Sequence, residues 1–420
     1  MEKRNVVIIG GGPAGLAAAI GAYEAGERDI LILEREPKLG GILNQCIHNG
    51  FGLHTFKEEL TGPEYASRFI DKVKELGIEY KLDTTVISFD KNKVITAVNE
   101  TDGLIKIQAE AVVLCCGCRE RPRGGINIAG CRSAGIYSAG TAQKLVNIDG
   151  FMPGKEIVIL GSGDIGLIMA RRMTFEGAKV KACVELMPYS SGLNRNIVQC
   201  LKDFDIPLLF SHTVVDIKGE GRVKSVVIAE VDDRLNPKME TAQEITCDTL
   251  LLSVGLIPEN ELAKQAGVEL SPVTNGATVD DKMMTNIDGV FECGNVLHVH
   301  DLVDYVSEES ALAGAGAAKY VASGKVKSSG YTKIETFGGV RYCVPQLIER
   351  NDETEPFSLK MRVSNVFRNV YLRVYADGQL VAQKKKQIST PGEMETISLK
   401  AEQVATLRKA KEIKVGLEDK

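Results

Sequence analysis

The stretch Val6-Val-Ile-Ile-Gly10-Gly-Gly-Pro-Ala-Gly15 decides the fold of this chain. Its β-branched residues are typical of a buried parallel strand, and the residues from Leu16 to Ala25 predict a helix directly after the glycines. A second apolar run, Ile30 to Leu33, ends at Glu34. Strand, glycines, helix, strand and acid in this order are typical of a dinucleotide-binding unit.

Each residue type in this unit has a physical role. Gly10 permits a tight turn, Gly12 lets a pyrophosphate approach the backbone, and Gly15 lets the helix touch the strand. The start of the helix offers free N–H groups and the positive end of the helix dipole to phosphates. Glu34 is suited to accept hydrogen bonds from ribose hydroxyls.

The same unit then recurs. The predicted strand Glu156–Leu160 leads into Gly161-Ser-Gly-Asp-Ile-Gly166, and after a helix the strand Lys179–Val184 ends at Glu185. Gly10 to Glu34 spans 24 positions, and Gly161 to Glu185 also spans 24. Because two glycine-rich accidents would not share this spacing, we predict two dinucleotide sites.

Three further apolar runs end in glycine, namely Ala111–Gly117, Thr249–Gly255 and Gly289–Gly294. The third leads through Asn295 into an Ala/Gly-rich segment, Val303–Val321, that predicts a helix. Strands alternating with helices indicate an α/β fold with parallel sheets. We therefore expect two Rossmann-like domains of the three-layer ββα type.

After Gly330 the pattern becomes β-only. Val370–Tyr375 alternates at period two, Asp377-Gly378 is a tight-turn signal, and Lys384–Lys386 marks a charged strand edge. From Tyr331 onward there are 16 basic and 12 acidic residues, so this segment carries +4 and the rest −9. We predict a small β-rich, sandwich-like domain here.

The expected domains are a first nucleotide domain of residues 1–120 and 256–330, a second nucleotide domain of residues 121–255, and a C-terminal domain of residues 331–420. A net charge of −5 argues against a nucleic-acid partner, because phosphates demand a basic surface. No run is long enough to cross a membrane, and Met1–Gly15 lacks the apolar region of a secretion signal.

Ten cysteines are scattered through the chain, which favours reduced thiols in the cytoplasm over a disulfide framework. The cysteine and histidine spacings predict no metal site. His298 and His300 form the one candidate ligand pair, and a loop at the edge of a cofactor is the favoured interpretation for them.

Taken together, residues 5–325 resemble the two-dinucleotide-binding flavoproteins of the thioredoxin reductase and pyridine nucleotide–disulfide oxidoreductase superfamily. The resemblance implies FAD in the first unit and NAD(H) in the second. The FAD residues it implies are Gly10, Gly12, Pro13, Ala14, Gly15, Glu34, Arg35, Gly41, Asn49, Val86, Cys116, Gly117, Gly294 and Asn295. The NAD residues it implies are Gly161, Gly163, Asp164, Ile165, Gly166, Glu185 and Gly255.

The chain departs from the family at several positions. Asn295 stands where the family has an Asp that bonds the flavin ribitol, so it keeps an acceptor but loses the charge. The stretch that carries a C-x4-C pair in one branch has only Cys46, and the positions of the alternative CxxC pair read Ala139 to Ala142. We therefore predict no thioredoxin or glutathione reduction.

Cofactor preference follows from Glu185, which suits a free ribose 2′-hydroxyl and repels a 2′-phosphate. The residues after it, Leu186–Tyr189, offer no basic partner for that phosphate. NAD(H) is thus favoured over NADP(H).

The sequence thus predicts an FAD-containing, NAD(H)-dependent oxidoreductase. One alternative is an NADH oxidase or peroxidase that uses Cys46, whose pKa His48 and His54 would lower. Another is a non-catalytic flavin-bearing interaction subunit.

The arrangement also resembles flavoprotein subunits that accompany glycerol-3-phosphate, opine, amine or cyanide-forming dehydrogenases. Cys46–His54 and His298–Asp304 carry the likeness to the glycerol-3-phosphate subunits. This implies a partner dehydrogenase subunit or an electron-acceptor protein. The sequence does not determine the oligomeric state, and a dimer is compatible with it.

Overall fold

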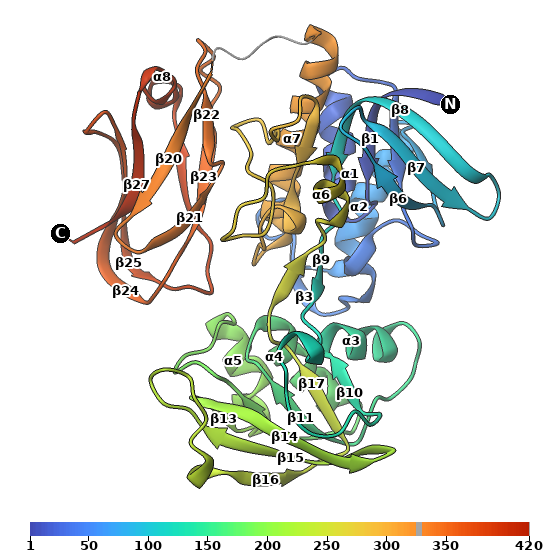
Figure 1. Ribbon diagram of the computed structural model, residues 1–420, viewed down its shortest axis with the longest axis vertical. Helices are drawn as coiled ribbons and strands as arrows, with labels where there is room; N and C mark the ends of the chain where they lie inside the picture. The colour runs from blue at the N-terminus through green and yellow to red at the C-terminus, as the bar shows by residue number, and fades with distance from the viewer. Residues whose placement is uncertain (325–329, 420) are drawn as a thin grey trace. The chain divides into compact units, whose positions relative to one another are not determined.

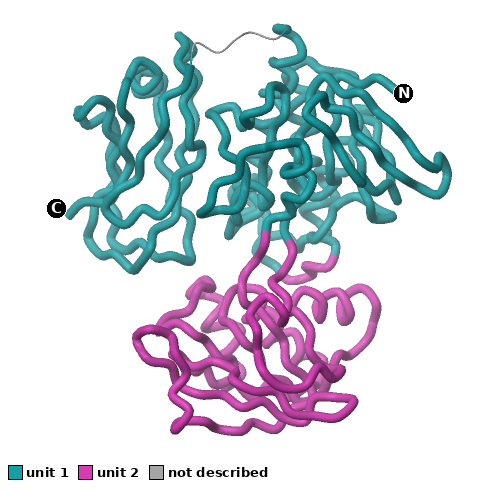
Figure 2. The backbone as a smooth tube through the Cα atoms, in the orientation of Figure 1, with its two compact units in different colours: residues 1–44, 49–118, 258–420 teal, residues 45–48, 119–257 magenta. Residues whose placement is uncertain are grey.

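The computed structural model describes residues 1–324 and 330–419. The chain forms two compact units (Figure 2): unit 1 holds residues 1–44, 49–118 and 258–420, and unit 2 holds residues 45–48 and 119–257. Two paired strands carry the chain between them, β9 (Cys118–Glu120) and β18 (Leu256–Pro258). The C-terminal residues group with the first nucleotide fold, in unit 1.

Unit 1 is built on a seven-stranded sheet in the order β5-β2-β1-β8-β7-β6, with β19 also paired to β8 (Figure 1). Its central strand β1 runs parallel to both neighbours, and residues 6–9 on it are at most 5% exposed. A strand covered on both faces needs a continuous apolar run, as the sequence predicted. The strands are β1 (Glu2–Ile9), β2 (Ile30–Leu33), β5 (Glu79–Lys81), β6 (Thr85–Phe89), β7 (Val94–Asn99), β8 (Gly103–Leu114) and β19 (Val290–Glu292).

Two helices of unit 1 pack backbone to backbone. A methyl group at Gly21 of α1 would lie 2.3 Å from the carbonyl oxygen of Ala311 in α7, and one at Gly314 would lie 1.9 Å from that of Ala18. This contact explains why both helices are rich in Gly and Ala. The helices are α1 (Pro13–Glu24), α2 (Gly62–Glu75), α6 (Glu261–Ala266) and α7 (Val303–Ser323), with the 3₁₀ turns η1 (Gly41–Gln45) and η5 (Gly294–Val296) and the short strand pair β3 (Asn49–Phe51) and β4 (Leu60–Thr61).

Unit 2 repeats the design on a parallel five-stranded sheet, β10-β17-β11-β12-β13, and adds an antiparallel sheet, β14-β15-β16. The strands are β10 (Ile136–Ser138), β11 (Glu156–Leu160), β12 (Lys179–Val184), β13 (Leu208–Leu209), β14 (His212–Glu220), β15 (Arg222–Glu230), β16 (Gln243–Thr246) and β17 (Thr249–Leu252). The helices are α3 (Ala139–Asn147), α4 (Asp164–Phe175) and α5 (Asn194–Cys200), with 3₁₀ turns at Arg123–Gly125, Lys202–Phe204 and Met239–Thr241. The predicted two Rossmann-like folds are confirmed.

The C-terminal β-rich domain is also confirmed, as two sheets with a core of their own. The expectation of β structure alone is wrong at one place, because α8 (Ala401–Lys409) turns Val404 and Leu407 into this core. The predicted turn has positive φ at Asp377 and Gly378, and the lysine-rich strand β25 is an edge strand. The two sheets contain β22 (Leu347–Glu349), β20 (Tyr331–Phe337), β27 (Ile413–Glu418), β24 (Phe367–Ala376) and β25 (Gln379–Ser389), and β21 (Val340–Val344), β23 (Phe357–Val363) and β26 (Glu395–Leu399).

Charged side chains join this domain to the rest of unit 1. Arg408 Nη2 lies 2.6 Å from Asp281 Oδ2, and both side chains are only 2% exposed. Arg362 donates to the carbonyl oxygen of Val299 at 3.1 Å and lies 3.4 Å from Asp301. The contact between the C-terminal domain and the rest of unit 1 is therefore partly ionic. Its stability depends on each buried charge keeping its partner.

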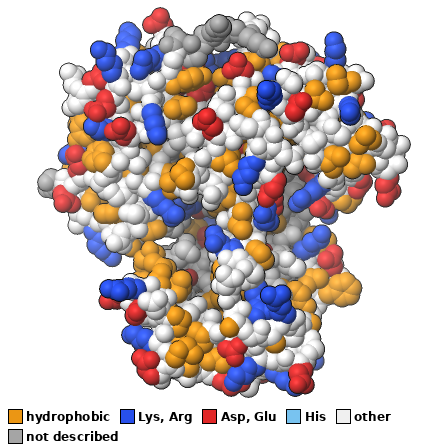
Figure 3. All heavy atoms as spheres, viewed as in Figure 1, with side chains coloured by type: hydrophobic (Ala, Val, Ile, Leu, Met, Phe, Trp, Pro, Cys, Tyr) orange, Lys and Arg blue, Asp and Glu red, His pale blue; other side chains and the backbone are white. Residues whose placement is uncertain are grey.

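At the surface, Lys and Arg side chains lie interspersed with Asp and Glu side chains over the face shown in Figure 3. Within residues 1–324 and 330–419, no helix is both long and apolar enough to cross a membrane.

Breaking the buried Arg408–Asp281 pair should destabilise unit 1. We expect Arg408→Met to cost about 3–5 kcal/mol of unfolding free energy, because it leaves the Asp281 carboxylate buried without its partner. The matched control is Lys319→Met, which removes an exposed partner of Glu355 and should cost at most about 1 kcal/mol. Urea unfolding followed by circular dichroism measures both. An equally small loss of unfolding free energy in both variants would show that the Arg408–Asp281 pair does not stabilise the domain.

Candidate cofactor sites

The first glycine-rich loop joins β1 to α1 through contacts that exclude side chains. A methyl group at Gly15 would lie 1.8 Å from the carbonyl oxygen of Gly10, and one at Gly10 would lie 2.5 Å from that of Cys115. Gly10 also has a φ of +109°, which L side chains rarely adopt. Pro13 occupies the first turn of α1, where its missing N–H costs nothing.

The second loop has the same construction. A methyl group at Gly161 would lie 2.0 Å from the carbonyl oxygen of Ser253, and one at Gly166 would lie 2.8 Å from that of Gly161. Gly161 has a φ of +97°. The two predicted fingerprints are thus alike in geometry as well as in spacing.

The middle glycine of each loop is not required by the protein itself. Gly12 has φ −78° and ψ −170°, and Gly163 has φ −68° and ψ 162°, conformations open to any residue. A methyl group at Gly12 would lie 3.8 Å from Gly41 and one at Gly163 3.5 Å from Ser253 Oγ, which are ordinary contacts. Each glycine keeps a cradle open at a helix start with no side-chain cap, which fits a pyrophosphate.

A carboxylate closes each loop. Glu34 accepts from the N–H of Gly11 at 2.6 Å and from that of Glu36 at 2.9 Å. Glu185 accepts from the N–H and Oγ of Ser162, at 2.8 and 2.6 Å, and from the N–H of Met187 at 2.9 Å. A carboxylate has about four acceptor positions, so both retain capacity for a ribose hydroxyl.

Unit 1 gathers most of the predicted FAD residues around its loop. A methyl group at Gly41 would lie 2.9 Å from Gly12 Cα, and one at Gly294 would lie 2.9 Å from the Ala14 Cβ. Thr84, two residues before Val86, donates its N–H to the Glu34 carbonyl at 2.8 Å. The remaining members are the exposed Arg35, the exposed Asn49 at the start of β3, and Cys116 with Gly117 after β8.

In unit 2, the predicted NAD residues follow the strands β11, β12 and β17. Asp164 Oδ1 accepts from the N–H of Leu193 at 2.8 Å and from Asn196 Nδ2 at 2.7 Å. Its side chain therefore orders the neighbouring loop. Ile165 is half-buried in α4, and Gly255 has a φ of +100° after β17.

The structure gives the Asn295 side chain a backbone partner. Its Oδ1 accepts from the backbone N–H of His300 at 3.0 Å and lies 3.3 Å from His300 Nδ1. Because an N–H must face an oxygen, this bond fixes the carboxamide orientation. The backbone N–H of His300 already occupies this oxygen, and the NH₂ group of Asn295 remains for a ligand.

Cys46 and His48 belong to unit 2, and their pKa values oppose the activated thiol that the peroxidase alternative requires. Burial raises the pKa of Cys46 to about 12, so it is a thiol at neutral pH. Burial, together with Arg171 and Arg195, lowers the pKa of His48 to about 4. A neutral His48 supplies no positive charge to stabilise a thiolate.

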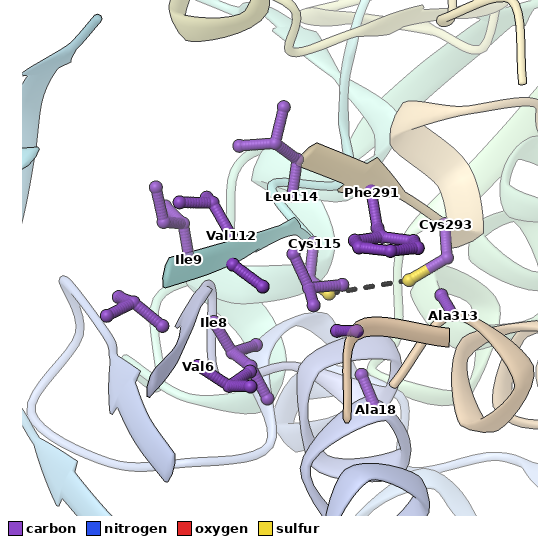
Figure 4. Close-up of a cluster of buried hydrophobic side chains, with 14 of the residues drawn as sticks. Val6, Ile8, Ile9, Ala18, Val112, Leu114, Cys115, Phe291, Cys293 and Ala313 are labelled. Atoms are coloured by element: carbon purple, nitrogen blue, oxygen red, sulfur yellow. Dashed lines mark hydrogen bonds between the residues drawn. The ribbon is translucent and has the colours of Figure 1, made fainter. Parts of the chain in front are cut away.

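Sequence reasoning missed a close pair of thiols. Cys115 and Cys293 point toward one another at the ends of β8 and β19, with their Sγ atoms 3.5 Å apart (Figure 4). Both are free, and they are 6% and 0% exposed among the apolar side chains of the core. Burial, above all, raises the pKa of Cys115 well above its usual range, so it is a packing thiol. β8 and β19 run parallel with Leu114 opposite Glu292, so the residues that follow them, Cys115 and Cys293, lie side by side.

Two Rossmann-like folds with two open phosphate cradles define a class of proteins, the flavoproteins that bind FAD and a pyridine nucleotide. The family model for pyridine nucleotide–disulphide oxidoreductases matches residues 4–319, and the chain belongs to this family. The resemblance drawn from the glycine loops is thus confirmed, as are FAD and pyridine nucleotide as its cofactors.

The curated relatives include enzyme subunits and thioredoxin reductases. The chain is 27% identical to the hydrogen cyanide synthase subunit HcnB of Pseudomonas protegens, over 63% of this chain and 59% of that protein. It is 26% identical to an opine oxidase subunit of Rhizobium meliloti, over 76% and 61%. It is also 26% identical to a thioredoxin reductase of Listeria innocua, over 76% and 93%. The matched part thus spans about three-fifths of the synthase and oxidase subunits.

Among solved structures, thioredoxin reductase from T. acidophilum matches 76% of this chain and 99% of its own, with a TM-score of 0.62 and 24% identity. This likeness supports the fold of the two nucleotide units.

The glycine contacts predict different outcomes for neighbouring substitutions. Gly12→Ala should give a folded chain that purifies with about tenfold less FAD, because the methyl group enters the phosphate cradle. Gly163→Ala should keep its FAD and lose affinity for NADH instead. Gly15→Ala should fail to fold stably, since its methyl group meets the Gly10 backbone. Circular dichroism, released flavin and NADH titration measure the three. A Gly12→Ala protein with full FAD content would contradict the cradle.

Proposed function

We propose that the chain is an FAD-containing oxidoreductase that uses NAD(H) and passes electrons to a second small molecule or protein. The observation that carries the proposal is the duplicated loop, in which a carboxylate is fixed beside an open glycine cradle in each unit. FAD supplies the capacity to accept a hydride from the nicotinamide and release electrons to another acceptor. The protein supplies binding and orientation.

The residues of each loop have separate tasks in this proposal. The uncapped starts of α1 and α4 hold the two pyrophosphates through their free N–H groups. Glu34 and Glu185 hold the adenosine riboses. In unit 1, Asn295 presents its NH₂ group, and Gly294 beside Ala14 lets the two flavin-contacting segments meet.

Electron transfer without a redox disulfide is the finer part of the proposal. The positions that carry the CxxC pair of one branch are here Ala139 and Ala142, both buried in α3. Cys46 stands alone in its stretch and has a raised pKa. The reduced flavin therefore passes its electrons directly to the acceptor. The alternative, to which the relatives named thioredoxin reductase point, is transfer through a redox-active disulfide.

A partner protein is a natural acceptor or donor. HcnB and the opine oxidase relative are, by their names, subunits of larger enzymes. We propose that this chain likewise works with a dehydrogenase subunit or an electron-acceptor protein, in the reducing cytoplasm that its ten free thiols suit.

NADH should reduce the flavin about tenfold or more faster than NADPH, because the Glu185 carboxylate accepts from a ribose hydroxyl and repels a 2′-phosphate. Glu185→Gln should narrow this ratio while keeping the oxygen that faces Ser162. The matched control, Glu34→Gln in the other loop, should change FAD retention and leave the ratio unaltered. Stopped-flow flavin absorbance gives the rates. Equal rates for the two nucleotides in the parent protein would refute the assignment.

Cys46→Ser should leave NADH-dependent reduction of an artificial dye within about twofold of the parent, since a protonated thiol takes no part in the transfer. Neither protein should reduce thioredoxin or glutathione disulfide efficiently. If the substitution instead removes a robust peroxide turnover present in the parent, the peroxidase alternative is correct. Absence of any flavin reduction by NADH would favour the non-catalytic interaction subunit.

A further inference from the structure

A buried cluster of charges lies directly behind the flavin-contacting segment of unit 1. Glu309 of α7 places its Oε2 2.8 Å from His298 Nε2, 3.3 Å from His300 Nε2 and 3.7 Å from Lys360 Nζ. All four side chains are at most 6% exposed. We call these four residues the Glu309 cluster. Lys360 comes from β23, in the C-terminal β domain.

The cluster is bonded to both residues proposed to contact the flavin. Glu309 Oε1 accepts from the backbone N–H of Gly294 at 3.0 Å. His300 donates its backbone N–H to Asn295 Oδ1 and places Nδ1 3.3 Å from the same oxygen. A displacement of Glu309 therefore moves the Gly294-Asn295 segment itself.

The ligand types of His298, His300 and Glu309 match a metal site, and their ligand atoms lie within 4.8 Å of one another. Two observations favour a hydrogen-bonded ion cluster instead. The 2.8 Å separation of His298 and Glu309 is a hydrogen-bond distance. The Lys360 ammonium already stands beside the carboxylate as a cation, and it is held there by the carbonyl oxygen of Tyr305 at 3.0 Å.

The charge state of Glu309 depends on these neighbours. Burial alone would raise the pKa of Glu309, but His300, His298 and Lys360 hold it well below its usual range. Burial lowers the pKa of His298 to about 4, so this ring is neutral and donates. Lys360 is then a fixed positive charge that balances the buried carboxylate, which would otherwise be costly to ionise.

Other titratable groups face the cluster from each surrounding element. Burial raises the pKa of Glu292 in β19 to about 8, so its carboxyl is protonated at neutral pH. Tyr342 in β21 lies edge-on to His298, and burial raises its pKa to about 12. Asp301 pairs with Arg362 of β23 at 3.4 Å. None of these groups supplies the unpaired positive charge that Glu309 needs.

We propose that Lys360 is a positioning residue of the flavin site, through which the C-terminal β domain fixes the Gly294-Asn295 segment by way of Glu309. The proposal rests on FAD binding in unit 1, as given under the proposed function. It makes the C-terminal domain a component of the cofactor site.

The test is FAD affinity, measured on the full chain by titrating FAD into flavin-free protein. Lys360→Met should weaken binding about tenfold, because the buried Glu309 carboxylate loses its ammonium partner. Lys360→Arg keeps the positive charge and should stay within about threefold of the parent.

The matched control is Lys384→Met, in the same domain on the exposed strand β25. It should bind FAD as the parent does. A Lys360→Met protein with parental affinity would overturn the proposal. A loss that Lys360→Arg or Lys384→Met shares would also overturn it by showing only general destabilisation.

A second comparison serves if Lys360→Met does not fold. Glu309→Gln removes the negative charge and keeps the shape, so adding Lys360→Met to it should cost less than about twofold in FAD affinity. A further tenfold loss in the double variant would contradict the proposed charge coupling. If the parent and all variants bind FAD as predicted but NADH does not reduce it, the proposed function is wrong and the role of Lys360 stands.

Discussion

The contact between helix and strand in each nucleotide fold is the constraint on which the rest of the structure depends. At Gly15 and Gly166 the helix backbone lies so close to the preceding turn that no side chain fits. This contact places the uncapped helix start directly over the carboxyl end of the parallel sheet. Because the close contact between helix and turn is made at Gly15 and Gly166, the space beside Gly12 and Gly163 stays open.

Buried carboxylates then fix the loops that the glycines leave flexible. Glu34 and Glu185 bond the backbone of their own loops, and Glu309 does the same for Gly294. Three separate segments around the cofactor sites are therefore each held by a buried acidic side chain. The first two acids hold backbone N–H groups within their own folds, whereas Glu309 has a lysine from another domain beside it.

Sequence alone predicted the parts of the molecule that depend on local pattern. Each glycine loop and the acid that follows it, Glu34 or Glu185, lie within one supersecondary unit, so their spacing carries the information. Local patterns likewise predicted that the nucleotide-binding fold occurs twice and that the chain turns at Asp377-Gly378. What the sequence did not predict depends on contacts between distant residues: Lys360 and Glu309 are 51 positions apart, and Cys115 and Cys293 are 178 apart. The raised pKa of Cys46 was missed for a related reason, because burial depends on tertiary packing, whereas the neighbouring histidines were visible in the sequence.

The most direct test of the account is an anaerobic titration of the purified, FAD-loaded chain with NADH, followed at the flavin absorbance. On the proposed route the flavin takes up two electrons and no disulfide shares them, so one NADH per FAD should complete the bleaching. Uptake of about two equivalents would contradict the account, since it requires a second redox centre such as a disulfide. No bleaching at all would remove NADH as the electron donor.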